Sequence, residues 1–213
     1  MAEKSQGGGG LRDRQKTQRQ EAILAAAERH FATHAPDDVK MGDIARDAGV
    51  STPTVFNYFG SKDELLLAII LKGNAEARAR AAAIRADATV GVSDGICRIL
   101  EAYSELSSRL LSKEAWRHAE AVHIRHPAST FVRRYDAINR HIVEDLSAHL
   151  NARVPSDRLA PEDADLIARL VFSRWNGLFL DYIRDDGLAF EAHLAAVARE
   201  MGQVLRLLGL SPA

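Results

Sequence analysis

The chain has 213 residues, 46% of them hydrophobic and 27% charged, which is ordinary for a globular protein that buries a large core. Its formal net charge is −1, so the composition excludes a molecule-wide basic field and leaves only a local surface for nucleic acid. The single cysteine, Cys97, excludes an internal disulfide, and no apolar run approaches the ~20 residues of a membrane-spanning helix, so we expect no membrane partner.

Residues 1–11 form a polar, glycine-rich segment for which the sequence predicts a flexible arm. The segment lacks the apolar core of a signal peptide, and the lone cysteine suits a reducing compartment, so we expect a cytoplasmic protein. Basic residues, Arg14 among them, then precede a helix that is predicted to run to about Thr33. Such residues can contact phosphates or the minor groove of DNA, and a solvated helix start explains each of them equally well.

Residues 41–60 predict two short helices joined by a tight turn. Gly49 ends the first helix, because glycine adopts the left-handed conformation of a helix C-terminus at little cost. Pro53 suits the first turn of the second helix, where its missing N–H matters least. Ala45, Gly49 and Val55 have the spacing of a helix-turn-helix, whose second helix enters the major groove of DNA. An ordinary helical hairpin is the alternative.

A long helix is predicted from Ser61 to about Ala86. Ser61 and Glu64 match the S-x-x-E capping box, in which a hydroxyl and a carboxylate satisfy free backbone N–H groups at the helix start. The second half of the helix is rich in alanine, which favours helix strongly. Gly73 costs about 1 kcal/mol relative to alanine, which indicates a bend or the close approach of another helix.

The remaining sequence predicts five further helices, at roughly 94–111, 113–125, 128–152, 162–184 and 188–209. No alternating apolar and polar run typical of a strand occurs, so the predicted fold class is all-α with about nine helices. The last two helices are apolar over more than one face, and so wide an apolar surface must be buried against several neighbours. A homodimer formed through these two helices satisfies the requirement, and a monomer with a thick core is the alternative.

The run GVSTPTVFNYFGSKDELL at residues 49–66 resembles the end of the DNA-binding domain of the TetR family of transcriptional regulators. The resemblance also takes in residues 43–45 and the preceding helix, so it covers about residues 14–68. It implies a three-helix DNA-binding domain at 12–68 and a helical ligand-binding and dimerisation domain at 69–213. It further implies a homodimer that binds a palindromic operator in double-stranded DNA, as a repressor released by a small molecule.

Two positions depart from the family pattern. Lys40 stands where a threonine or serine usually caps a helix and contacts a phosphate, and Phe56 stands where tyrosine is usual. Lys40 can still bind phosphate as a point charge, and the Phe56 ring can contact a sugar or a thymine methyl. The departures keep open a helical interaction module, or an enzyme-like small-molecule-binding protein, that has lost DNA binding.

The residues expected to contact DNA comprise most of the second helix of the helix-turn-helix, two lysines placed for phosphates, and one basic residue ahead of them. They are Arg14, Lys40, Thr52, Pro53, Thr54, Phe56, Asn57, Tyr58 and Lys62. Thr54 suits a thymine methyl and Asn57 an adenine edge. No arginine lies on this helix, so we expect the basic segment or DNA shape to contribute to specificity.

The small-molecule pocket implied by the family resemblance would lie among the C-terminal helices. Its candidate lining residues combine aromatic bulk with polar tips: Tyr103, Trp116, His123, Phe131, Tyr135, Trp175, Asn176 and Phe179. Each of them can equally be plain core. Because few of them carry charge, an apolar or aromatic effector is favoured. Asn176 is the most informative, since an amide within an apolar stripe needs a hydrogen-bonding partner or a ligand.

An enzyme is the competing class. His141, Asp145 and His149 recur every four residues and could hold a metal ion, but an exposed ionic face beside the apolar stripe explains them better. No H-E-x-x-H, phosphate-binding loop or G-x-S-x-G motif occurs. We therefore expect no catalytic residues, no metal and no cofactor.

Overall fold

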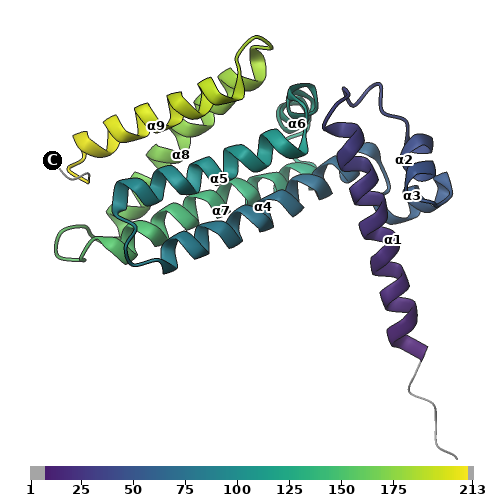
Figure 1. The fold of residues 1–213 in the computed structure, drawn as a ribbon, viewed down its shortest axis with the longest axis horizontal. Helices are drawn as coiled ribbons and strands as arrows, with labels where there is room; N and C mark the ends of the chain where they lie inside the picture. The colour runs from purple at the N-terminus through teal and green to yellow at the C-terminus, as the bar shows by residue number, and fades with distance from the viewer. Residues whose placement is uncertain (1–7, 211–213) are drawn as a thin grey trace, which may run out of the picture.

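The computed structural model describes residues 8–210, which form nine α-helices and no strand (Figure 1). This confirms the predicted all-α class. The helices are α1 (Gly8–Phe31), α2 (Met41–Asp47), α3 (Thr52–Phe59), α4 (Lys62–Ala86), α5 (Val92–Leu110), α6 (Lys113–Arg125), α7 (Thr130–Arg153), α8 (Pro161–Arg184) and α9 (Phe190–Leu207). None of them, over the described range, is long and apolar enough to cross a membrane.

The start of α1 differs from the expected arm. The helix begins at Gly8 rather than after residue 11, and residues 1–7 lie outside the described range. Glycine weakens a helix by about 1 kcal/mol per residue relative to alanine but does not forbid helical backbone, so the glycine run is a poor boundary signal. The other predicted boundaries agree with the structure to within two residues.

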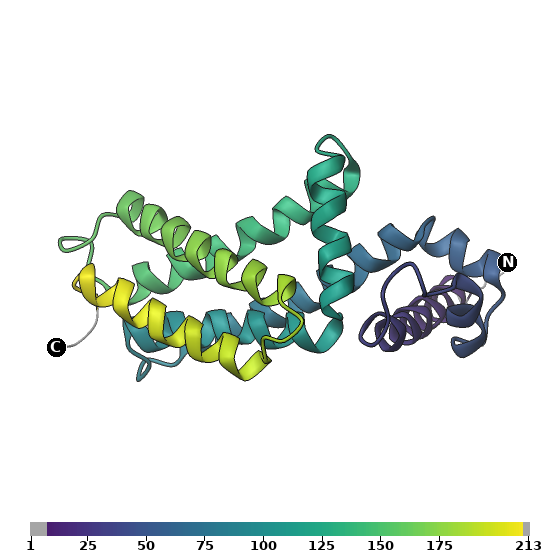
Figure 2. The same cartoon turned by 90° about the horizontal axis from the view of Figure 1, so that it is seen from above.

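Helix α4 connects two groups of helices. Its first turns pack with α1–α3, where Leu65 and Ile69 join Ile23 and Phe31 in one core. Its alanine-rich half packs against α5 and α7, and its Ala77 and Ala81 join a second core that residues of α8 and α9 complete. Helix α6, drawn in teal in Figure 2, stands across the molecule between these groups and contacts α4, α7 and α8. The core of the first group continues through α6, so the two groups form one packed body.

Gly73 marks a close helix approach rather than a bend. A β-carbon built on Gly73 would clash with the Cδ1 atom of Leu110 on α5. The missing side chain therefore lets α4 and α5 pack closely along their length, with buried Ala77 and Ala81 continuing the contact.

Helices α8 and α9 bury only part of their apolar surface within one chain. Trp175 on α8 and Met201 on α9 belong to the core. Leu166 and Leu170, one turn apart on α8, remain 48% and 54% exposed, and Leu207 at the end of α9 is exposed as well. A single chain thus leaves an apolar stripe on this pair of helices uncovered.

Candidate nucleic-acid interface and buried cavity

The turn between α2 and α3 has the geometry that its sequence predicts. Gly49 has φ 67°, in the left-handed region where glycine is favoured. The Val50 N–H donates to the Ala45 carbonyl at 2.9 Å and the Gly49 N–H to the Arg46 carbonyl at 3.1 Å. This pair of bonds is the Schellman motif, which satisfies the free carbonyls at the end of α2 and turns the chain sharply.

Helix α3 presents one face to solvent. The Ser51 hydroxyl caps it by accepting from the Thr54 N–H at 3.4 Å. Val55 and Phe59 are buried against the neighbouring helices, which leaves Phe56 and Asn57 exposed. Among the other predicted contacts, Pro53 is exposed, whereas Thr52, Thr54 and Tyr58 are half-buried. The Thr54 hydroxyl lies 2.8 Å from that of Ser51, so it already has a partner within the protein.

The two lysines predicted near phosphates differ in their freedom. Lys40 is exposed at the N-terminus of α2 and makes no side-chain cap, as its identity predicts. Lys62 is half-buried, and its ammonium donates to the carbonyl of Pro36. Lys62 therefore ties the loop before α2 to the start of α4, and two of its three donors remain for another partner.

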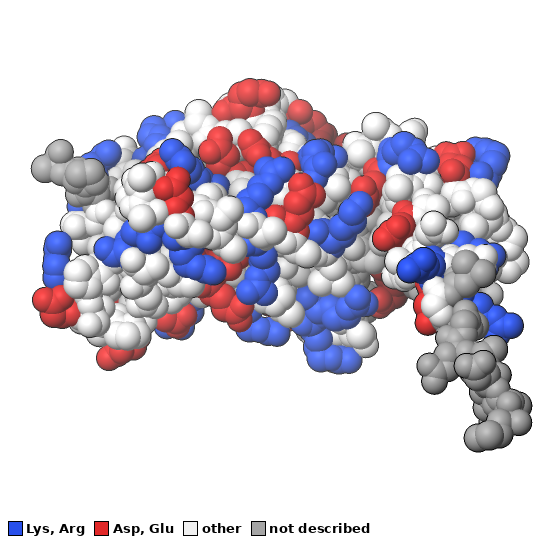
Figure 3. Space-filling view, turned by 60° about the horizontal axis from the view of Figure 1, so that its bottom comes forward, with Lys and Arg blue, Asp and Glu red and all other residues white. Residues whose placement is uncertain are grey.

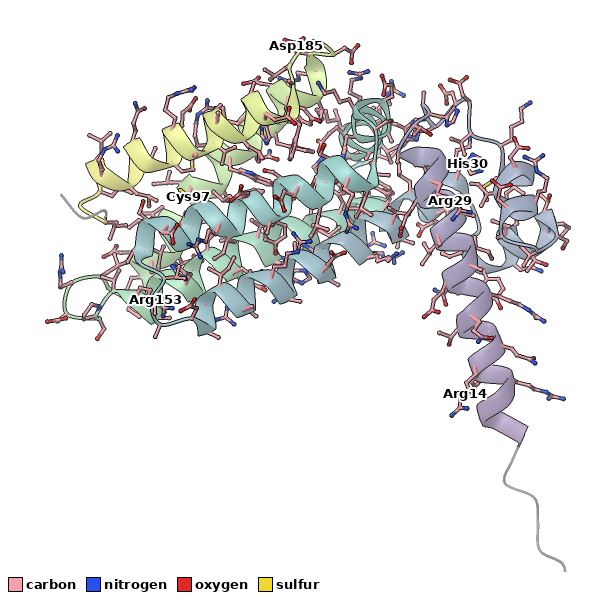
Figure 4. All side chains as sticks on the ribbon, in the orientation of Figure 1. Arg14, Arg29, His30, Cys97, Arg153 and Asp185 are labelled. Atoms are coloured by element: carbon pink, nitrogen blue, oxygen red, sulfur yellow. The ribbon has the colours of Figure 1, made fainter. Side chains whose placement is uncertain are left out.

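The predicted basic segment is helical. Arg12, Arg14, Lys16 and Arg19 are all exposed on the first half of α1, which extends away from the rest of the molecule (Figure 4). Basic and acidic side chains are interspersed over the C-terminal helices (Figure 3). These α1 residues lie on a helix and not on the extended strand that a minor-groove arm would form.

Only one of the two hydrogen bonds of the predicted capping box at Ser61 forms. The Ser61 hydroxyl accepts from the Glu64 N–H at 3.1 Å, but the Glu64 carboxylate accepts from Arg134 of α7 at 2.8 Å. The neighbouring Asp63 pairs with His118 of α6 at 2.8 Å. A tertiary partner has replaced the local one, and both contacts fix the start of α4 to the C-terminal helices.

The turn between α5 and α6 contacts the end of α1. The Ser112 N–H donates to the Phe31 carbonyl at 2.8 Å, and its hydroxyl donates to the His34 carbonyl at 3.3 Å. The two residues before Ser112, Leu110 and Leu111, line a cavity between the helices. This turn therefore joins the cavity directly to the helix that supports α2 and α3.

The cavity lies between α4, α5, α6, α7 and α8 and has a volume of about 50 Å³. Six of the eight predicted ligand residues line it: Tyr103, Trp116, Tyr135, Trp175, Asn176 and Phe179. The Trp175 and Phe179 rings stack with centroids 5.9 Å apart, and Trp116 meets the Phe179 ring edge-on at 5.1 Å. Aromatic faces thus form much of the wall.

Two predicted ligand residues lie outside the lining. Phe131 stacks on Tyr135 with ring centroids 5.9 Å apart and belongs to the core. His123 packs against the same Tyr135 ring and pairs with Asp136 at 2.8 Å. Tyr135 takes the position next to the cavity, so both residues support that ring rather than contact the space.

The prediction of an exposed ionic face on α7 is wrong. Asp145 and His149 are buried, and His141 is half-buried. Asp145 accepts from the Tyr103 hydroxyl at 2.7 Å, and the His149 ring occupies the space left by the missing side chain of Gly95. Their burial depends on α5, which periodicity within α7 does not reveal. Within residues 8–210, these residues form no cluster of three or more potential metal ligands.

The sequence did not identify the polar residue of α4 that lines the cavity. Asn74 is 7% exposed, and its Oδ1 lies 2.9 Å from the Nδ1 of His141. The only sequence signal was an amide next to Gly73 in a helix whose inward face is otherwise apolar. Asn139 and Asn176 also line the cavity, so three amides face an aromatic wall.

Comparison with known proteins supports the architecture. A family model described as bacterial regulatory proteins, tetR family, matches residues 23–69. The chain is 32% identical over 165 residues to the HTH-type transcriptional regulator BetI of Agrobacterium fabrum, covering 76% of this chain and 75% of that protein. It is 42% identical over 52 residues to the HTH-type transcriptional regulator EthR of Mycolicibacterium smegmatis, covering 24% of each chain.

The fold agrees as well. A transcriptional regulator from Cytophaga hutchinsonii superposes with a TM-score of 0.71 at 19% identity, covering 89% of this chain and 97% of that chain. Its likeness concerns most of the fold, whereas the family model concerns only residues 23–69, which contain the helix-turn-helix. The geometry of α2 and α3 agrees with the family model and with the alignment to BetI over three-quarters of its length. We conclude that this chain belongs to the tetR family of helix-turn-helix transcriptional regulators.

Proposed function

We propose that this regulator is a cytoplasmic homodimeric repressor that binds a palindromic operator through α3 and leaves it when a small molecule occupies the cavity. The observation that carries the DNA-binding proposal is the α2–turn–α3 unit, with Gly49 at φ 67° and the exposed side chains Phe56 and Asn57 on the outer face of α3. Asn57 is the residue best suited to read a base, because an amide pairs in two places with an adenine edge.

Nonspecific affinity would come from exposed cations on α1 and at the start of α2. Lys40 at the start of α2 and Arg14 on α1 are exposed. A substitution that removes one phosphate contact should make the negative slope of log affinity against log salt concentration less steep by about one. Lys62 contributes less than its position in the sequence suggests, because its ammonium already serves Pro36.

The dimer proposal rests on the uncovered stripe of α8 and α9. Leu166 and Leu170 are about half exposed within one chain, and Gly177 continues the same side of α8 without a bulky side chain. A second copy packed against this stripe would bury both leucines, at roughly 25 cal/mol per Å² of apolar area removed from water. Two-fold symmetry then places two α3 helices for two half-sites of a palindrome.

The release proposal rests on the α5–α6 turn. A cavity of about 50 Å³ is smaller than the ~150 Å³ space that admits benzene, so a ligand must displace lining side chains. Displacement of Leu110 or Leu111 would shift Ser112, which holds the end of α1 through two hydrogen bonds. The ligand then favours a state in which the two α3 helices no longer match successive major grooves.

The test uses the operator recovered from genomic fragments and three proteins. The Asn57→Ala variant should bind the operator at least tenfold more weakly than wild type, with unchanged thermal stability, because Asn57 is exposed. The matched control is Asn151→Ala, which removes an exposed asparagine from the far end of α7. Equal operator affinity for all three proteins would contradict the assignment of α3 as the reading helix.

A further inference from the structure

The four aromatic hydrogen-bond donors around the cavity already have partners in the protein. The Tyr103 hydroxyl donates to Asp145 at 2.7 Å, and the Tyr135 hydroxyl donates to Glu120 at 2.5 Å. Burial, and then the neighbouring carboxylate, raises the pKa of both phenols, so both hydroxyls keep the proton that they donate. Neither tyrosine therefore has a hydrogen left for a ligand.

The two indole N–H groups are committed as well. Trp116 donates to the backbone carbonyl of Ser107 at 2.9 Å, and Trp175 donates to the hydroxyl of Ser104 at 3.0 Å. The aromatic residues thus offer their ring surfaces to the cavity, while their polar atoms face the surrounding protein.

Asn74 differs from all four. Its side chain is 7% exposed, and its oxygen faces His141. Its amide nitrogen is buried and has no hydrogen-bonding partner among the described residues. A buried donor left without a partner costs about 1–3 kcal/mol, so the site is built for a group that accepts this hydrogen bond.

Charge narrows the class of that group. No lysine, arginine, histidine, aspartate or glutamate lines the cavity. The carboxylates of Asp145 and Glu120 accept from the two tyrosine hydroxyls, and of these two only Asp145 has an arginine, Arg78, beside it at 3.8 Å. An anionic ligand would be buried without a cation and near these carboxylates, which is costly. A cationic ligand could rest on the aromatic rings, but it would leave the Asn74 N–H unsatisfied.

We infer that the cavity binds a neutral ligand that combines an aromatic or compact apolar body with one hydrogen-bond acceptor, such as a carbonyl oxygen, and that the side-chain N–H of Asn74 binds this acceptor. The inference rests on the proposed function for the role of the cavity as an effector site. Asn74 follows Gly73, whose missing side chain makes room for Leu110 of α5, so the acceptor is held next to this close approach of α4 and α5.

The experiment compares four probes of similar size. Acetophenone has an aromatic body and a carbonyl acceptor, ethylbenzene lacks the acceptor, benzoate is an anion and phenyltrimethylammonium is a cation. Binding is followed by ¹⁹F NMR of protein labelled with 5-fluorotryptophan. Trp116 and Trp175 are the two tryptophans of the chain, and both line the cavity, so their resonances report its occupancy directly.

We expect wild-type protein to bind acetophenone at least tenfold more tightly than ethylbenzene and more tightly than either ion. Asn74→Leu keeps the approximate shape but removes the donor, and Asn74→Asp keeps a partner for His141 but replaces the N–H by an oxygen. Both variants should bring the ratio of acetophenone to ethylbenzene affinity to within threefold of one. The control variant Asn151→Leu, far from the cavity, should keep the wild-type ratio.

Three outcomes would overturn the inference. The first is equal wild-type affinity for acetophenone and ethylbenzene, and the second is an unchanged ratio in both Asn74 variants that fold. The third is preference for one of the ions, or no shift of either tryptophan resonance with any probe. The probe experiment contains no DNA, so these outcomes do not bear on DNA binding by the helix-turn-helix. Failure of the wild-type protein to bind any operator would contradict the proposed function but not the ligand class inferred for the cavity.

Discussion

A single buried hydroxyl connects three helices of the C-terminal body, and its removal gives a sharp prediction. Ser104 of α5 is 1% exposed and accepts from Trp175 Nε1 of α8 at 3.0 Å. Its oxygen also lies 3.3 Å from His193 Nε2 of α9. Burial lowers the pKa of His193 and favours the neutral ring, whose Nε2 accepts from the hydroxyl or donates to it according to the tautomer.

Ser104→Ala removes the partner of Trp175 Nε1 and of His193 Nε2, both of which belong to buried side chains. Each buried polar group left unsatisfied costs about 1–3 kcal/mol, so the variant should lose roughly 2–4 kcal/mol of unfolding free energy. Urea unfolding, followed by circular dichroism at one fixed protein concentration, measures the loss. The control Ser147→Ala, on the half-buried side of α7, should stay within about 0.5 kcal/mol of wild type.

A double-mutant cycle with Trp175→Phe separates the indole contribution. Once the indole N–H is gone, Ser104→Ala orphans only His193, so its cost should fall by about 1 kcal/mol or more. A Ser104→Ala variant within about 0.5 kcal/mol of wild type would refute the reasoning, because it would mean that the hydroxyl satisfies neither ring.

Three further predictions concern stability. Gly49→Ala should destabilise the protein by about 1–2 kcal/mol, because Gly49 has φ 67° and alanine is strained in this left-handed conformation. The added β-carbon meets open space, so thermal unfolding of this variant measures the backbone strain without a steric clash. The control Gly10→Ala, which also adds a β-carbon in open space but on helical backbone of α1, should be neutral or stabilising by up to about 1 kcal/mol. Equal effects of Gly49→Ala and Gly10→Ala would contradict the strain predicted at Gly49. Gly95→Ala should lower the melting temperature more than Gly49→Ala, since its β-carbon would fall on the His149 ring; a smaller drop would mean that the ring moves aside freely. Unfolding free energy should also decrease as the pH falls below about 6.5, because burial lowers the pKa of His149 and His193 only in the folded state, so the unfolded chain binds more protons. Urea titrations at pH 7.5 and 5.5 test this against a His193→Phe variant, whose stability should change less with pH.

Features set by a few neighbouring residues could be predicted from the sequence. The turn at Gly49 and the hydroxyl cap at Ser61 depend on bonds that span six residues or fewer, and both form as expected. The helix boundaries follow from the same local rules. The exception is the start of α1, where a glycine run does not end the helix.

Contacts between distant helices could not be predicted in this way. Glu64 prefers Arg134 to its local capping role, and Lys62 bonds to the carbonyl of Pro36. The buried pair of Asp145 and Tyr103 joins two helices whose relative rotation no periodicity reports. Large aromatic residues on apolar stripes were good guides to the cavity, because such side chains face the interior wherever their helices pack.

Whether α3 reads DNA can be tested by recovering bound fragments of genomic DNA with the full chain at a low and a high salt concentration. We expect one palindromic motif whose half-site centres lie about one helical turn of DNA, or a multiple of it, apart. Its enrichment should weaken steeply at the higher salt, because phosphate contacts release counterions. No enriched motif at either concentration, or a motif recovered unchanged by Asn57→Ala, would contradict the claim that α3 reads DNA.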